Sequence, residues 1–512
     1  MFSAAIVVVQ ACLVFMFIHI IFRLLLQPKK QRNIDGKKPP GPSSLPIIGN
    51  LHMIGTLPHR TLQSLSQKHG PIMSLKLGKL PTIVVSSSET AELFLKTHDL
   101  VFASRPKVPV SKILFYGNKG LAFCEYGSYW RSVKKVCVLQ LLTTSKIELF
   151  APIRKEELGV VVKSLEEAAA VGEVVNLSKV LENLAEDIVY KMILGCSKND
   201  EHDLKRLIHE ALTLLGTFDL ADFVPWIGPF DLQGLTRRCK KTSKALDVVL
   251  EKIITEHEQT ANKEGKTHHH HKDFVDILLS MMNQPLNSQN HVIIMDRTHI
   301  KAILLDMIIA SIETSATVIE WALSELLSHP RVMKILQDEI DNEVGISRMV
   351  EENDLVKLSY LDNVVDETLR LHPVAPLLIP RECRESITIN GYYIEKNSRV
   401  IVNVWAIGRD PNVWSENVET FYPERFVNKK MNYQGKEFHS VPFGSGRRGC
   451  PGAQLGLVTV KLVLAQLVHC FNWDLPSNIS PANLNMQEKF GLTITRVQQL
   501  QAIPTSRLAN DA

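Results

Sequence analysis

The stretch Phe443-Gly444-Ser445-Gly446-Arg447-Arg448-Gly449-Cys450-Pro451-Gly452 decides the fold of this chain. Four glycines around one cysteine allow the backbone to bend tightly and to approach a flat group at close range. The apolar run from Leu455 to Val468 follows and predicts a helix. Cys450 is therefore expected near a helix N-terminus, where free N–H groups and the helix dipole stabilise a thiolate.

A single thiolate held in this way, with arginines beside it, suits an axial ligand of haem iron, with an arginine pairing with a haem carboxylate. A disulfide would need a partner cysteine in a matching context, and a nucleophilic cysteine would need a paired histidine. The sequence offers no signature of either.

The whole segment resembles the haem-binding loop of the cytochrome P450 monooxygenases, whose pattern FxxGxRxCxG it matches at every specified position. Further motifs of that family occur in the family's order: Glu367-Thr368-Leu369-Arg370 matches ExxR, and Pro423-Glu424-Arg425-Phe426 matches PERF. The phrases Trp405–Pro411 and Pro380-Arg381-Glu382, with the layout of the N-terminus, resemble the plant A-type, membrane-bound branch. The resemblance extends from Pro39 to the end of the chain.

The resemblance implies a mainly α fold with small β-sheets, in which haem b lies between a long central helix and the C-terminal cysteine-ligand loop. The expected divisions are an N-terminal transmembrane anchor (1–26), a basic and Pro-rich hinge (27–42) and a catalytic domain (43–512). Alternating patterns predict one hairpin from residues 72–77 and 82–85, and another at 387–394 with its turn at Asn390-Gly391.

The N-terminus predicts a membrane anchor. Residues 4–22 are apolar except for Gln10 and His19, and Leu24–Leu26 extend the run to the length that crosses a bilayer. Basic residues follow the run rather than precede it, so the positive-inside rule keeps the rest of the chain cytosolic. With the resemblance, this places the protein in the endoplasmic reticulum membrane as a single-pass protein. The stiff segment Pro39-Pro40-Gly41-Pro42 follows as a spacer.

Composition excludes other classes of protein. The 512 residues are 45% hydrophobic and 22% charged, which fits a folded chain, and the formal net charge of +4 is too small for a nucleic-acid binder. The 8 cysteines form no CxxC pair, which argues against a disulfide scaffold and against a structural zinc site.

A long helix is predicted from an N-cap at Asp296 to Ser328, before Pro330. In its middle, the Thr314 hydroxyl can bond back to the carbonyl of Ala310 and open a groove for dioxygen and water. In the family, the matching threonine stabilises dioxygen and the preceding acid feeds protons, so the resemblance assigns these roles to Thr314 and Glu313. The chain departs from the family at Ser311, where glycine is usual.

Other site residues are implied by the resemblance alone. Glu367, Arg370 and Arg425 correspond to a buried triad with a structural role. Lys134 stands where the family usually has arginine, and it cannot make a planar two-pronged contact with a propionate. The expected haem-binding residues are Trp130, Lys134, Arg381, Phe443, Arg448, Cys450 and Gly452. The expected substrate-pocket residues are Ile309, Ala310, Val374, Leu378 and Leu492.

The implied reaction inserts one oxygen atom of O2 into a lipophilic organic substrate, a plant terpenoid or phenolic. Because the chain has no GxGxxG phosphate-binding pattern after a strand, electrons must come from another protein. The resemblance implies the NADPH-cytochrome P450 reductase, with cytochrome b5 as a secondary donor. Two alternatives stay open: a haem-thiolate isomerase or dehydratase that needs no external electrons, and a non-catalytic membrane haem protein. The tract His268–His271 has no assigned role.

Overall fold

The computed structural model describes residues 15–17, 36–195, 204–264, 272–287, 292–415, 417–427, 431, 438–477 and 479–508. Most of the predicted anchor (1–26), much of the hinge (27–42) and the tract His268–His271 lie outside the described residues. Phe15, Met16 and Phe17 are helical, and their side chains are 54–73% exposed.

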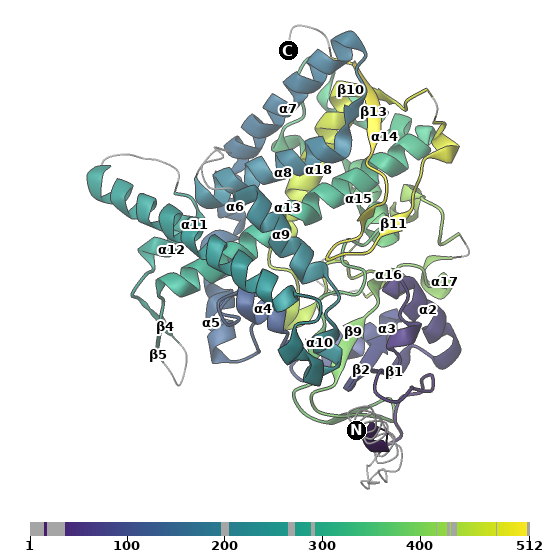
Figure 1. Ribbon diagram of the computed structural model, residues 1–512. Helices are drawn as coiled ribbons and strands as arrows, with labels where there is room; N and C mark the ends of the chain where they lie inside the picture. Colours follow the sequence, from purple (N-terminus) through teal and green to yellow (C-terminus); the bar gives the residue numbers. More distant parts are fainter. Residues whose placement is uncertain are drawn as a thin grey trace, which may run out of the picture.

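Helices make up most of the molecule, as predicted, and the small sheets lie at separate places around them (Figure 1). The α-helices are α2 (Pro58–His69), α3 (Ser88–Glu92), α4 (Pro109–Leu114), α5 (Ser128–Val136), α6 (Thr144–Leu149), α7 (Ala151–Val171), α8 (Leu177–Leu194), α9 (Leu204–Gly216), α10 (Leu220–Phe223), α11 (Leu235–Glu264), α12 (Phe274–Ser280), α13 (Arg297–Ser328), α14 (Pro330–Val344), α15 (Ser359–Leu371), α16 (Val404–Ile407), α17 (Pro411–Trp414) and α18 (Ala453–Cys470).

The main sheet has four strands in the order β1-β2-β9-β6, formed by β1 (Ile72–Leu77), β2 (Leu80–Val85), β9 (Arg399–Val402) and β6 (Arg381–Glu382). The second sheet has the order β10-β13-β3, formed by β10 (Phe471–Asp474), β13 (Gln501–Ser506) and β3 (Val175–Asn176). Three hairpins complete the described strands: β7 (Ile387–Ile389) with β8 (Tyr392–Ile394), β11 (Glu488–Lys489) with β12 (Thr495–Arg496), and β4 (Pro285–Asn287) with β5 (Val292–Ile294).

Both predicted hairpins are present. Ile72 pairs with Val85 at one end of the first, and Asn390 and Gly391 both have positive φ at the turn of the second, as a tight two-residue turn requires. The hairpin β4–β5 was not predicted, because the region from residue 146 to 371 reads as helical in period.

The central helix α13 organises the core. Its N-cap is Asp296, whose side chain accepts a 2.9 Å hydrogen bond from the backbone N–H of His299, and the helix ends at Ser328 as predicted. One apolar cluster packs around its first half and another, shared with α8, α15 and α18, packs around its second half. Both α13 and α18 are long and apolar enough to span a membrane, but 72% and 61% of their apolar windows are buried, so both are core helices.

Candidate haem and oxygen-activation site

The cysteine loop has the tight backbone that the sequence predicts. Gly446 has φ +68°, and a Cβ atom there would lie 2.3 Å from the carbonyl oxygen of Leu95, so only glycine fits. The short 3₁₀ turn η9 (Gly446–Arg448) follows, and the backbone N–H of Cys450 closes the loop on the carbonyl of Phe443 at 2.9 Å. Gly452 is the N-cap of α18, so the cysteine stands just before the helix start.

Cys450 combines two properties of a side chain that lines an interior space. It is exposed by surface area, yet protein surrounds it, and burial raises the pKa of its thiol. The backbone N–H of Gly452 and the charge of Lys134 act in the opposite direction.

The middle of α13 is open where both of its ends are buried. Residues 300–309 and 316–327 of this helix are buried, whereas Ala310 is exposed and Ser311, Glu313 and Thr314 are partly exposed. Thr314 Oγ1 donates a 2.7 Å hydrogen bond to the carbonyl of Ala310, the contact expected from the sequence. The helix therefore presents a short accessible segment with three hydroxyl groups, those of Ser311, Thr314 and Ser315, and one carboxyl group, that of Glu313.

Glu313 is held in a state that favours its protonated form. Burial raises the pKa of its carboxyl, and the neighbouring Thr493 hydroxyl opposes that shift. Among the described residues, neither Glu313 Oε2 nor Thr493 Oγ1 makes a hydrogen bond of ordinary geometry, although the two side chains lie close together. A carboxyl whose pKa is raised in this way is better suited to give up a proton and take one back than an ordinary surface glutamate.

Several expected haem-binding side chains gather in one cationic cluster, which we define as Arg105, Lys134, Arg381, Arg447 and Arg448 around the carboxylate of Asp99. Arg381 Nη1 lies 3.2 Å from Asp99 Oδ1, and Arg447 Nη1 lies 2.8 Å from Asp99 Oδ2. Lys134 donates to the carbonyl of Arg447. Trp130 lies against the cluster, with the Arg448 guanidinium 4.2 Å from its ring centroid.

Three arginines of the cationic cluster, Arg105, Arg381 and Arg448, are buried without enough negative charge. Arg448 donates to the carbonyls of Ala103, Leu121 and Cys124, which satisfies its hydrogen bonds but not its charge. Burial lowers the pKa of Arg381 to about 10, and burial with repulsion from Arg381 lowers that of Arg448 to about 10.

Burial first, and then repulsion from Arg448 and Arg381, lowers the pKa of Arg105. A buried excess of positive charge of this kind is stabilised by an anion. The two propionates of a haem would supply that anion, so the residues present fit a haem whose iron faces Cys450.

The triad residues are also brought together. The Arg370 guanidinium holds Glu367 through two contacts of 2.6 and 2.7 Å, and Arg425 Nε lies 3.1 Å from Glu367 Oε1. Arg370 and Glu367 are fully buried.

The expected pocket residues lie in three places. Ile309 and Ala310 are consecutive on α13, and Leu378, which has φ 50°, lies near Gly444 of the cysteine loop. Val374 accepts a 3.0 Å hydrogen bond from the backbone N–H of Ile494. Leu492 packs on Gly216 at the end of α9.

Sequence reasoning missed Arg105 and Asp99. Arg105 donates to the carbonyls of Ala122, Ile379 and Pro380, and Asp99 is the carboxylate of the cationic cluster. The one signal for Arg105 was a lone arginine that follows the apolar residues 101–103 after a single serine, Ser104.

Comparisons with known proteins agree with this geometry. The family profile described as "Cytochrome P450" matches residues 39–500. The chain is 56% identical over 485 residues to cytochrome P450 CYP736A12 of Panax ginseng, covering 94% of this chain and 96% of that protein. It is 42% identical over 491 residues to the desmethyl-deoxy-podophyllotoxin synthase of Sinopodophyllum hexandrum, with 95% of each chain covered. A solved zebrafish cytochrome P450 structure with abiraterone superposes with a TM-score of 0.74 at 25% identity, covering 88% of this chain and 100% of that one.

Proposed function

We propose that this chain, which belongs to the plant cytochrome P450 family and is therefore a haem monooxygenase, oxidises a lipophilic terpenoid or phenolic substrate. The observation that carries the proposal is the open middle of α13, where Ala310 is exposed between two buried stretches of helix. The pocket residues expected around it are Ile309, Ala310, Val374, Leu378 and Leu492, all apolar, which favours a lipophilic molecule over a charged metabolite. One relative is named for the synthesis of desmethyl-deoxy-podophyllotoxin.

The protein's own residues have three tasks in this reaction. A bound haem would supply the redox-active iron that activates dioxygen, and the Cys450 thiolate would hold that iron. The cationic cluster would hold the haem propionates. Thr314 and Glu313 hold and deliver protons at the open segment of α13, and the Ser311 hydroxyl lies one turn before them.

The electron source is a second part of the proposal. An NADPH-cytochrome P450 reductase delivers the electrons, with cytochrome b5 as a secondary donor, and both dock on the face that carries Arg447. Arg447 supports this part because its side chain is 44% exposed. The proposed location is the endoplasmic reticulum membrane, with residues 1–26 as anchor and the catalytic domain in the cytosol. The exposed apolar side chains of Phe15–Phe17 are consistent with such an anchor.

The test is reconstitution of the full-length protein with a plant reductase in membranes, followed by a panel of terpenoids, phenolics and charged metabolites. We expect NADPH consumption and an oxygenated product, labelled from ¹⁸O₂, only with lipophilic compounds. A rearranged product formed without NADPH would instead indicate the isomerase or dehydratase. Haem binding with no turnover of any compound would indicate a non-catalytic haem protein.

The proton-delivery roles are tested by measuring how much of the NADPH consumed leads to product rather than to peroxide. Thr314→Ala should keep haem binding but release more peroxide per NADPH, and product yield should fall by on the order of 10²-fold. The double variant with Ser311→Gly reveals whether the second hydroxyl substitutes. If both variants remain fully coupled, the roles of Thr314 and Glu313 are wrongly assigned.

A further inference from the structure

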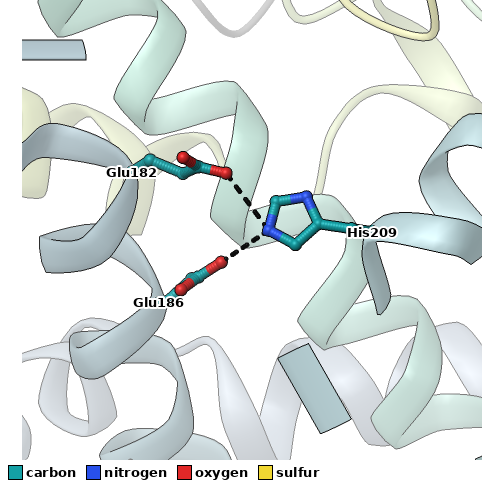
Figure 2. Close-up of side chains that lie close together, drawn as sticks. All are labelled: Glu182, Glu186 and His209. Carbon is teal, nitrogen blue, oxygen red and sulfur yellow. Dashed lines mark hydrogen bonds and ion pairs between the residues drawn. The ribbon is translucent and has the colours of Figure 1, made fainter. Parts of the chain in front are cut away.

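A cluster of two carboxylates and one imidazole lies between α8 and α9, outside the site described above. Glu182 and Glu186 are four residues apart on α8 and share one face of it, and both point toward His209 of α9 (Figure 2). His209 Nε2 lies 2.8 Å from Glu186 Oε1 and 3.1 Å from Glu182 Oε1. We define these three residues as the acid–imidazole cluster.

The acid–imidazole cluster runs from solvent to the interior. The side chain of His209 is 39% exposed and that of Glu182 is 30% exposed, whereas Glu186 is only 1% exposed. Two lysines balance the charge: Lys179 Nζ lies 2.8 Å from Glu182, and Lys205 Nζ contacts Glu186. One member can therefore exchange protons with water while another lies inside the protein.

Two members of the acid–imidazole cluster, His209 and Glu182, lie close enough to Glu313 for their charges to act on its carboxyl. The backbone provides the link: a Cβ atom on Gly216, at the end of α9, would lie 2.8 Å from the backbone nitrogen of Leu492, and the next residue, Thr493, lies beside Glu313. Because α8 also packs on α13, both helices of the cluster are fixed relative to the open segment.

The reaction needs such an entry. Insertion of one oxygen atom of O2 into a C–H bond, with reduction of the other atom to water, consumes two electrons and two protons. Electrons come from the reductase, and each proton that Glu313 gives up must be replaced from solvent. Glu313 Oε2 is buried without a hydrogen-bond partner, whereas buried carboxylates are normally bonded to protein or water.

We propose that Glu182, Glu186 and His209 form the entry through which solvent protons recharge Glu313, by way of water between the acid–imidazole cluster and the Thr493–Glu313 pair. The inference rests on the proposed monooxygenase function and extends it to a relay outside the expected site residues. In one cycle, His209 passes its Nε2 proton inward through the carboxylates to Glu313 and takes another from solvent. The charge of the cluster is therefore the same before and after each proton transfer.

The charge states suit this task. The hydrogen bond to Glu186 raises the pKa of His209, with further help from Glu182 and opposition from burial and Lys205. Burial acts to raise the pKa of Glu186, but its bonds to His209 and Lys205 outweigh burial and lower it. The protonated imidazole is therefore favoured beside the carboxylate of Glu186, and Glu313, whose pKa is raised by burial, is the acceptor of the proton.

The first test needs no substrate. Infrared spectra of the haem-loaded full-length protein are recorded over pH, and the carboxyl band lost in Glu313→Gln is followed. His209→Gln removes a positive charge and should raise the pH at which this band titrates, whereas Glu182→Gln removes a negative charge and should lower it. Glu210→Gln is the matched control, because Glu210 follows His209 in α9 but pairs with Arg238. Two unshifted titrations would overturn the proposal.

The second test compares two oxidants on a substrate that the wild type converts. Oxidation by hydrogen peroxide takes up no net protons, because RH and H2O2 balance ROH and H2O, whereas the NADPH-driven reaction takes up two. His209→Gln should lower NADPH-driven product by on the order of 10-fold, enlarge its solvent isotope effect and leave peroxide-driven product unchanged. Equal loss in both reactions, or loss in neither, overturns the proton entry. If the wild type forms no product with either oxidant, the proposed function fails. The infrared titration of Glu313 then still tests the proposed proton entry, because it needs no substrate.

Discussion

Two buried arginine networks in this protein differ in how their charge is balanced. In the triad, two guanidinium groups share the carboxylate of Glu367, and Arg370 and Arg425 extend their remaining N–H groups to backbone carbonyls such as those of Gly408 and Trp414. The backbone N–H of Tyr422 also donates to Glu367, at 2.8 Å. The triad is closed within the protein.

The cationic cluster is different because Asp99 faces five basic side chains. Its arginines also bond to backbone carbonyls, but repulsion among them lowers the pKa of Arg105 and Arg448, after the larger effect of burial. A network that is satisfied by its own residues is structural, and a network with buried charge in excess is completed by a ligand. Variants of the triad should therefore lose folding stability, whereas variants of the cationic cluster should lose haem affinity.

The largest effect is expected for Glu367→Gln. This change leaves two buried guanidinium groups without a counter-charge, and breaking a buried ion pair in this way costs about 3–5 kcal/mol. Chemical denaturation should show that loss both with and without haem. Glu385→Gln, at an exposed glutamate, is the control. A loss of stability that appears only in the haem-loaded protein would show that the triad also depends on the ligand, and would contradict its purely structural role.

A smaller effect, and one specific to haem, is expected for Arg381→Gln. Removing one cation of the cationic cluster should weaken haem binding by about 1.5–3 kcal/mol, the range of a charge-assisted hydrogen bond, or roughly 10- to 100-fold in affinity. The unfolding free energy of the haem-free protein should change less, because the excess positive charge falls. Haem transfer to apomyoglobin measures the affinity. Unchanged haem loss in this variant contradicts the assignment of Arg381 to a propionate.

The third effect depends on pH and concerns Asp306, which lies next to the cationic cluster. Asp306 of α13 accepts hydrogen bonds from the backbone N–H groups of Leu121 and Ala122, and the Leu121 carbonyl accepts from Arg448. Burial raises the pKa of Asp306 to about 7, above its ordinary value of 3.8. Because the folded protein binds this proton more tightly, its stabilising contribution is complete below pH 4 and is lost as pH rises through 7.

Asp306→Asn should therefore remove that pH dependence. Relative to wild type, the variant should gain at most about 4 kcal/mol of unfolding free energy between pH 4 and pH 8, because the pKa rises from 3.8 to about 7 and one pKa unit corresponds to about 1.4 kcal/mol. Denaturation at several pH values measures the difference. A difference between the two proteins that is constant over this range would show that Asp306 does not titrate there.

The features that could be predicted from the sequence are those that depend on residues close together in the chain. The mainly α fold, the helix from Asp296 to Ser328 and the bond from Thr314 to the Ala310 carbonyl follow from capping residues, proline and spacing, and the structure has all three. The family was identified from the cysteine loop with the ExxR and PERF motifs, and the family profile confirms it.

The features that escaped prediction depend on tertiary contacts between distant segments. Asp99 and Arg105 meet Arg381 and Arg448 only after the main sheet and the cysteine loop pack together. Glu182 and Glu186 have helical spacing, but that pattern equally fits a solvated face, and His209 lies on another helix. Local sequence could not show that their charges are held near Glu313.

The central claim is that Cys450 is the thiolate ligand of a haem held between its loop and the open middle of α13. The carbon monoxide difference spectrum of the reduced full-length protein tests it most directly, with Cys450→His and, as control, Cys470→Ser, at a buried cysteine outside the loop. We expect the long-wavelength Soret band of thiolate-ligated haem in the wild type and the control. Cys450→His should show the shorter-wavelength band of imidazole ligation, because imidazole is neutral and donates less to iron. A wild-type band that persists in Cys450→His would contradict the claim.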